Sequence, residues 1–250
     1  MNGALQIINE LLDFIHVSPT AYQAAAVLIR MLKESGFKEL KEEDSWNLKP
    51  GEGYYLQRNS STVAAFRVGL KMPAETGFLM AGAHTDSPSL KLKYPVKAAA
   101  ASSVEIYGNP ILSTWLDRVK ARSFFISADG AHAVHPNFPG KHDSKFAPEL
   151  NKGPVLKMNA GYSYATNSES TLVFDNLCRR AGVQYQRFIG RSDIPSGSTI
   201  GSISSSQLGI RTVDIGNPML AMHSIRETAG VDDHSAMIRI LSEYYRDGIG

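Results

Sequence analysis

The spacing of hydrophobic positions first predicts the helices of the chain. Residues 4–15 repeat apolar side chains at helical spacing, which is typical of an amphipathic helix. A second helix is expected to begin with Ser18 as its N-cap and Pro19 as its first residue, and to stop at Gly36. Further helices are predicted over residues 168–181, from the small-residue loop 196–201 to residue 207, and over residues 232–246.

The remaining apolar runs are short and predict strands. Two of them, residues 54–57 and 63–68, flank the turn formers Asn59-Ser60-Ser61 and predict a hairpin. The other runs that predict strands or strand ends are residues 78–82, 90–93, 104–107, 123–127, 154–158, 183–189, 210–215 and 219–224. Because strands and helices alternate in the second half, we expect a largely parallel sheet with helices on both faces.

Residues 94–126 interrupt this regularity. Residues 98–101 are four alanines, followed by two serines, and they carry no cap, period or turn signal. Residues 111–118 form a separate segment, with very short connections to the neighbouring predicted elements.

The composition is that of an ordinary globular protein, with 43% hydrophobic and 20% charged residues in a chain of 250. A net charge of +2 gives no reason to expect nucleic acid or an acidic membrane as a partner. No run approaches the roughly 18 apolar residues of a membrane span, and the N-terminus lacks the features of a secretion signal. The single cysteine, Cys178, excludes an intrachain disulfide and suits a reducing cytoplasm.

Side chains that can bind metals gather where strands are predicted to end. His84 and Asp86 follow one strand, Asp129 and His132 follow another, and His223 lies at the end of a third. Ligands bind outside the carboxyl ends of strands in such sheets, and zinc takes imidazole and carboxylate ligands from separate elements. Any one of these strand ends is also explained by a buried histidine whose hydrogen bonds are satisfied. Three such strand ends in one sheet favour a metal site. The nearby serines lack the Gly-x-Ser-x-Gly pattern, which disfavours serine catalysis.

Seven short motifs occur in a fixed order along the chain. They are Gly82-Ala-His-Thr-Asp-Ser-Pro, Ser127-Ala-Asp-Gly-Ala-His-Ala-Val-His-Pro-Asn, Gly153-Pro-Val-Leu-Lys, Tyr164-Ala-Thr-Asn-Ser-Glu, Arg191-Ser-Asp, Gly197-Ser-Thr-Ile-Gly and Met222-His-Ser-Ile-Arg-Glu. In these motifs and their order, the chain resembles the M18 aspartyl aminopeptidases. The resemblance covers roughly the N-terminal hundred residues and nearly everything from Ser127 onward.

The resemblance implies a cytoplasmic exopeptidase that removes N-terminal Asp or Glu from peptides. It also implies two Zn²⁺ ions in each active site, with Co²⁺ or Mn²⁺ as alternative metals, and assembly into a homo-oligomer, a dodecamer. His84, Asp129 and His223 match the metal ligands of the family, and Asp86 matches the catalytic carboxylate that orients His84.

The same resemblance assigns His132, Lys157 and Tyr164 to the substrate pocket. A lysine suits this role because a fixed ammonium pairs with an acidic side chain and stays uncompensated beside a neutral one. The alternative for Lys157 is an exposed lysine at a strand end, which spacing alone does not exclude.

The chain departs from the family in its middle. M18 chains are longer, and between the counterparts of residues 94 and 127 they carry a second domain and two metal-site motifs: an Asp-Asn that bridges the metals, and a Glu-Glu pair with the general base. Glu42-Glu43 lies too early to match, and Asp175-Asn176 falls inside a predicted helix rather than at a strand end. Three protein ligands are too few for two catalytic zinc ions.

Two explanations stay open. Either the intact protein carries internal segments that this sequence lacks, or the chain is a catalytically inactive homologue that serves as an assembly or binding subunit. We favour the first, because a domain without internal strands would bare apolar surface. A different hydrolase acting on an amide is a weaker third possibility.

The expected fold is α/β, a three-layer zinc-peptidase-like domain with a mostly parallel central sheet. Residues 1–93 and 124–250 are assigned to this catalytic domain. Residues 94–123 are assigned to the remnant of an inserted, β-rich second domain.

Overall fold

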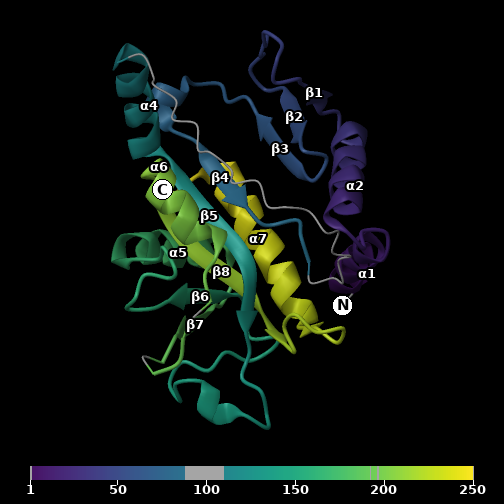
Figure 1. Cartoon of the computed structure of the whole chain (residues 1–250), viewed down its shortest axis with the longest axis vertical. Coiled ribbons are helices and arrows are strands. Elements are labelled where there is room, and N and C mark those ends of the chain that lie inside the picture. Colours follow the sequence, from purple (N-terminus) through teal and green to yellow (C-terminus); the bar gives the residue numbers. More distant parts are fainter. Residues whose placement is uncertain (1, 88–109, 192, 196, 250) are drawn as a thin grey trace, which may run out of the picture.

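The computed structural model describes residues 2–87, 110–191, 193–195 and 197–249 (Figure 1). Its α-helices are α1 (Asn2–His16), α2 (Ala21–Glu34), α3 (Pro73–Thr76), α4 (Pro110–Arg122), α5 (Ser168–Ala181), α6 (Ile200–Leu208) and α7 (Val231–Asp247). Its strands are β1 (Lys38–Glu39), β2 (Gly53–Arg58), β3 (Thr62–Arg67), β4 (Leu79–Gly82), β5 (Phe124–His132), β6 (Val155–Met158), β7 (Gln186–Ile189), β8 (Arg211–Leu220) and β9 (Thr228–Ala229).

The N-terminal part combines α1 and α2 with a small sheet in the order β1-β2-β3. The predicted hairpin is confirmed, because β2 and β3 pair antiparallel around a turn in which Asn59 and Ser60 have φ of 52° and 58°. The prediction that Ser18 caps the second helix is wrong. Thr20 is the N-cap, since its hydroxyl accepts a hydrogen bond from the Gln23 backbone and the helix begins only after it.

The second sheet has the strand order β4-β5-β8-β6-β7, with β9 beside β8. Three of its pairings are parallel and two, β6 with β8 and β8 with β9, are antiparallel, so the prediction of a mostly parallel sheet is confirmed. Two boundary predictions are wrong. Strand β8 covers most of the run 210–215, passes through Pro218 and ends at Leu220, so only the first two residues of the run 219–224 belong to it. Strand β5 continues to His132, so that Asp129 lies inside it.

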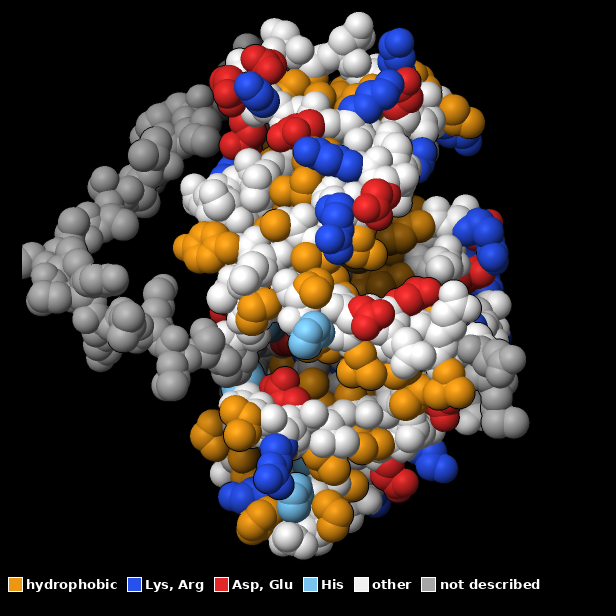
Figure 2. Space-filling view, turned by 90° about the vertical axis from the view of Figure 1, so that its right-hand side faces the viewer, with side chains coloured by type: hydrophobic (Ala, Val, Ile, Leu, Met, Phe, Trp, Pro, Cys, Tyr) orange, Lys and Arg blue, Asp and Glu red, His pale blue; other side chains and the backbone are white. Residues whose placement is uncertain are grey.

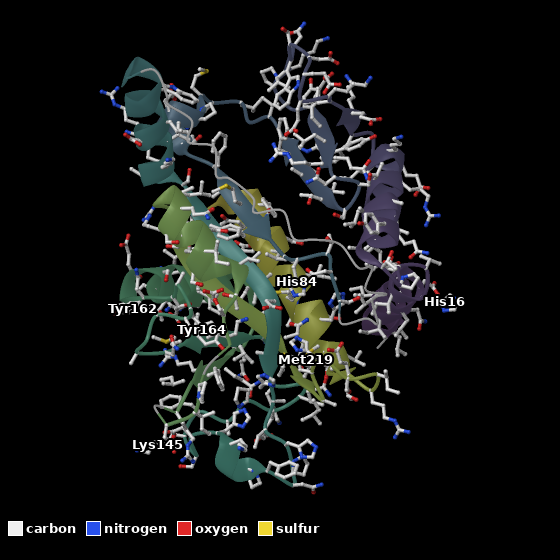
Figure 3. The ribbon with its side chains drawn as sticks, in the orientation of Figure 1. His16, His84, Lys145, Tyr162, Tyr164 and Met219 are labelled. Atoms are coloured by element: carbon white, nitrogen blue, oxygen red, sulfur yellow. The ribbon has the colours of Figure 1, made fainter. Side chains whose placement is uncertain are left out.

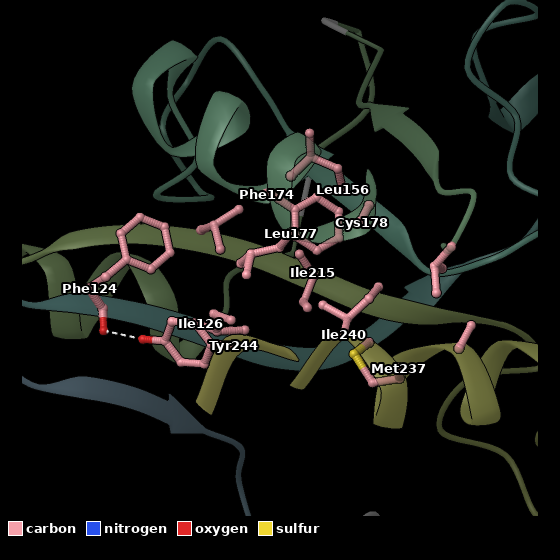
Figure 4. Close-up of a cluster of buried hydrophobic side chains, with 13 residues drawn as sticks. Phe124, Ile126, Leu156, Phe174, Leu177, Cys178, Ile215, Met237, Ile240 and Tyr244 are labelled. Carbon is pink, nitrogen blue, oxygen red and sulfur yellow. Dashed lines mark hydrogen bonds between the residues drawn. The ribbon is translucent and has the colours of Figure 1, made fainter. Parts of the chain in front are cut away.

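Helices cover both faces of this sheet, which confirms the three-layer α/β fold. Alternate residues of β5 and β8, among them Ile126 and Ile215, pack with α5 and α7 in the main hydrophobic core (Figure 4). The intervening residues point to the other face, where Asp214 contacts the start of α6. Because side chains alternate along a strand, Asp129 and Asp214 share that face.

Tyr244 of α7 joins the first two strands of the sheet. The Phe124 backbone N–H donates to the Phe78 carbonyl, so a parallel ladder would next join the Met80 N–H to the Phe124 carbonyl. The Tyr244 hydroxyl lies at this step of the ladder. It accepts from Met80 N at 2.9 Å, and it donates to Phe124 O at 2.7 Å (Figure 4). A helix side chain thus supplies part of the link between β4 and β5.

In Figure 2, acidic and basic side chains are interspersed on the surface, and hydrophobic side chains surround a hollow. Apolar residues of α1 and α2, such as Leu12 and Met31, are at least half exposed. The predicted strands at 90–93 and 104–107 and the alanine run lie outside the described residues, whereas residues 110–122 form α4. The assignment of residues 94–123 to a second domain stays a prediction. Within the described residues, no helix combines the length and the apolar character of a membrane span.

Candidate active site

His84 and Asp129 meet across the first two strands of the sheet. The register that pairs Gly82 of β4 with Ser127 of β5 places each of them two residues further along. The Nε2 atom of His84 lies 3.3 Å from Oδ1 of Asp129. Its Nδ1 atom lies 2.7 Å from the backbone carbonyl of Asp86 and 3.3 Å from the Asp86 carboxylate. Since a carbonyl can only accept, Nδ1 carries a proton, and in the neutral ring Nε2 presents its lone pair on the side of Asp129.

The electrostatic surroundings of His84 favour its charged form. Partial burial lowers the pKa of the imidazole, but the hydrogen bond to the Asp86 carbonyl and the charges of Asp129 and Asp86 together outweigh it, so the pKa is raised above its ordinary value. A cation placed at Nε2 would experience the same negative surroundings, with the Asp129 carboxylate as its nearest counter-charge.

Lys157 is buried beside this pair. Only 2% of the residue is exposed, which excludes the alternative of an exposed lysine at a strand end. Its ammonium donates to the Gly130 carbonyl at 3.1 Å, lies 3.7 Å from Oδ2 of Asp129 and lies 5.5 Å from the centre of the Tyr164 ring. Burial lowers the pKa of Lys157, and the charges of Asp129 and Asp214 oppose this effect.

His132 and Tyr164 line a cavity of about 540 Å³ next to the buried lysine. Figure 3 shows His84, Tyr164 and Met219 at the same end of the sheet, and Met219 is the β8 partner of His132 in the register. Burial lowers the pKa of His132, and the nearby charges of His142, His223 and Lys157 lower it further. The walls of the cavity also include Phe138, His142, Phe188, Gly197 and Met222.

His223 lies in the turn after β8, where the backbone is unusual. Both Ala221 and His223 adopt left-handed conformations, with φ of 55° and 67°, and the His223 N–H donates to the Glu227 carboxylate at 2.5 Å. The side chain is exposed and close enough to His132 to affect its pKa. The structure therefore brings His84 to Asp129, whereas His223 influences His132 only through the charge of its ring.

These residues do not form a complete zinc centre. No group of three His, Cys, Asp or Glu side chains among the described residues is arranged to hold a metal ion. The two acidic sequences rejected above are also elsewhere: Glu42 pairs with Arg58 beside the hairpin, and Asp175 pairs with Arg179 within α5. A zinc ion takes three or four protein ligands, so the donors present here are too few, and we derive no catalytic step through a metal.

Sequence reasoning missed two fully buried carboxylates, Asp214 in β8 and Asp233 in α7. Asp214 interrupts the apolar run Thr212-Val-Asp-Ile215, and an acidic residue inside a buried strand is a signal for a specific polar partner. Asp233 accepts hydrogen bonds from the backbone of Asn151 at 2.7 Å and Gly153 at 2.8 Å, and so holds the turn that precedes β6.

A three-layer α/β domain that brings a histidine after one strand beside an aspartate within the next is typical of the zinc-peptidase-like class of hydrolase folds. The chain matches the profile of one family in this class, described as "Aminopeptidase I zinc metalloprotease (M18)", over residues 14–119 and 118–245. It therefore belongs to the M18 aminopeptidase family, and the resemblance seen in the seven motifs is confirmed.

A probable M18 family aminopeptidase 2 from Clostridium novyi (strain NT) is 28% identical, over 98% of this chain and 100% of the relative. Among solved structures, Ape4 in its complex with Nbr1 shares the fold at a TM-score of 0.85, with 20% identity and coverage of 97% of this chain and 86% of that chain. The mApe1 dodecamer from S. cerevisiae has a TM-score of 0.80, with 17% identity and coverage of 100% and 98%.

The comparisons also locate a discontinuity. The alignment with the C. novyi relative extends over 431 positions, although this chain has 250 residues, so long gaps must face the relative's sequence. The family match falls into two parts that meet at residues 118–119, within α4. This point lies inside the interval where the motif comparison expects missing segments.

Proposed function

We propose that the site recognises peptides whose N-terminal residue is Asp or Glu, and that the intact protein removes this residue. The observation that carries the proposal is the buried ammonium of Lys157, 2% exposed and held beside the cavity that His132 and Tyr164 line. A buried cation is costly unless paired. Asp129 provides one counter-charge at 3.7 Å. A substrate carboxylate would add a second, whereas a neutral side chain would not.

In this proposal, His84, Asp129 and His223 contribute metal ligands, and the remaining ligands and the general base come from sequence beyond these 250 residues. Asp86 holds Nδ1 of His84 through its carbonyl and carboxylate, which fixes the ring with Nε2 on the side of Asp129. The residues of this chain position the substrate.

Substitution of Lys157 tests the substrate class. With the intact enzyme, Lys157→Ala should reduce kcat/KM for peptides beginning with Asp or Glu by about 100-fold or more, since truncating one partner of a buried charge pair is costly. Peptides beginning with Ala or Leu should change by only a few-fold. Lys71→Ala removes an exposed lysine and serves as the control. Equal losses on acidic and neutral peptides would contradict the proposed specificity.

A second candidate function is a non-catalytic subunit for assembly or binding, and the incomplete donor set favours it for the 250-residue chain taken alone. The intact mass of the protein purified from its natural source separates the two. A mass near 27.3 kDa would mean that the missing ligands are absent and would withdraw catalysis. A substantially larger mass, with close to two zinc ions per chain that His84→Ala or His223→Ala reduces, would support the aminopeptidase.

The proposal includes a homo-oligomer located in the cytoplasm, with zinc as its metal and Co²⁺ or Mn²⁺ as alternatives. Its support is the dodecamer of the structural neighbour mApe1, which shares this fold. Light scattering after size-exclusion chromatography measures the assembly directly, and a monomer at all concentrations would contradict it.

A further inference from the structure

Asp214 lies in β8, the strand between β5 and β6, and the site described above gives it no role. It is fully buried, on the face that also carries Asp129 and Lys157. The antiparallel register of β6 and β8 pairs Leu156 with Ile215, and its continuation places Lys157 opposite Asp214. A buried carboxylate must be satisfied by hydrogen bonds, so its partners show what it holds.

The first partner is the segment that carries Tyr164. The Ala165 N–H donates to Oδ2 of Asp214 at 2.6 Å. The backbone of Asp214 adds a further bond, because its N–H donates to the Thr166 hydroxyl at 2.9 Å. Both residues directly following Tyr164 are thus tied to β8. Asn167 then caps α5 by accepting from Ser170 N, which fixes the far end of the segment.

The second partner is the beginning of α6. The Thr199 hydroxyl donates to Oδ1 of Asp214 at 2.6 Å, although Thr199 is the N-cap residue and such a hydroxyl usually accepts from its own helix. Gly201 allows the close approach, since a Cβ there would collide with the carboxylate. The negative charge also lies at a helix N-terminus, where it is favourable. Gly197, two residues before Thr199, lines the same cavity as Tyr164.

We propose that Asp214 is a positioning residue that fixes two walls of the substrate cavity, the Tyr164 segment and the start of α6, to strand β8. Its two carboxylate oxygens accept one bond each, from Ala165 and from Thr199. An asparagine has a single acceptor oxygen, so one donor would face an amide group instead. The consequence for acidic substrates rests on the function proposed above, whereas the positioning itself does not.

Amide hydrogen exchange followed by NMR tests the positioning in the full chain without metal or substrate. Asp214→Asn should speed exchange of the Ala165 amide by about tenfold or more relative to wild type, with faster exchange also over residues 199–203. Thr199→Val should loosen residues 199–203, and Thr199→Ser, which keeps the hydroxyl, should not. Asp233→Asn is the matched control, because it removes an equally buried carboxylate that holds residues 151–153 instead.

Calorimetric binding of a peptide with N-terminal Asp gives the second readout. Asp214→Asn and Thr199→Val should weaken binding by about tenfold, and Thr199→Ser should restore it. If Asp214→Asn speeds exchange in these segments but the wild-type protein binds no acidic peptide, the positioning role stands and the proposed function is rejected. Unchanged exchange at Ala165 and residues 199–203, or an increase spread evenly over the core, would overturn the proposal. If Asp214→Asn does not fold, the contrast between Thr199→Val and Thr199→Ser decides.

Discussion

Replacing Tyr244 by phenylalanine should weaken the link between β4 and β5. The hydroxyl bridges the Met80 N–H and the Phe124 carbonyl, while the ring packs in the main core and remains in the variant. Each of the two hydrogen bonds lost contributes about 0.5–1.5 kcal/mol, so the substitution should lower the free energy of unfolding by about 1–3 kcal/mol. For a chain of this size, this corresponds to a fall in Tm of about 3–9 °C.

Thermal and urea unfolding followed by circular dichroism measure this loss. Tyr22→Phe is the matched control, because it makes the same chemical change at an exposed position of α2 and should be nearly neutral. The refuting result is a Tyr244→Phe variant with the Tm of the control. It would mean that the ladder between β4 and β5 holds the Met80 N–H and the Phe124 carbonyl equally well without the hydroxyl.

Two further predictions concern buried positions. Burial raises the pKa of the Cys178 thiol to about 12. A thiol reagent at pH 8 should therefore leave the native protein unlabelled and react only in urea. Rapid labelling of the native protein would contradict the burial of this side chain. Gly153→Ala should destabilise the protein by about 2 kcal/mol more than Gly36→Ala, as measured by urea unfolding. Both glycines have positive φ, but only a Cβ at Gly153 would collide with the Gln184 carbonyl, so equal effects would contradict the steric reasoning.

Local signals predicted those elements whose ends carry a cap. The bounds of α5 follow from Asn167 before it and Gly182 after it, which has a φ of 63°. The start of α2 was misplaced because Ser18 and Thr20 are both good N-caps, and only the folded backbone selects Thr20. The length of β8 was also missed, because Asn217-Pro218 reads as a break although tertiary pairing with β5 carries the strand through it.

The candidate site was predicted from motifs rather than from periodicity, and this explains what was missed. His84 and Asp129 could be named because strand ends attract functional residues, but their separation of 3.3 Å depends on the register of β4 and β5. The burial of Lys157 depends on the packing of Tyr164 over it. Asp214 has no strand-end signal at all, because its partners come from a loop and a helix far away in the sequence.

The break in the family match falls where the fold can tolerate it. Residues 118–119 lie in α4, which precedes β5, so sequence inserted there would enter between β4 and β5 along the chain. The strands β5, β8, β6 and β7 and the fully buried part of the core beneath α5 and α7 all follow this point. Strand β4 adds Leu79 and Ala81 to the edge of this core and is linked to it by Tyr244. Lys157, Tyr164 and Asp214 belong to this later part. The substrate side of the proposed site can therefore form from residues 124–249, whereas the metal side needs His84 from β4 and ligands from the segments that the longer relatives carry. On this reasoning, the 250-residue chain alone should bind acidic peptides better than it binds zinc, and separate calorimetric titrations with each ligand would measure the two affinities.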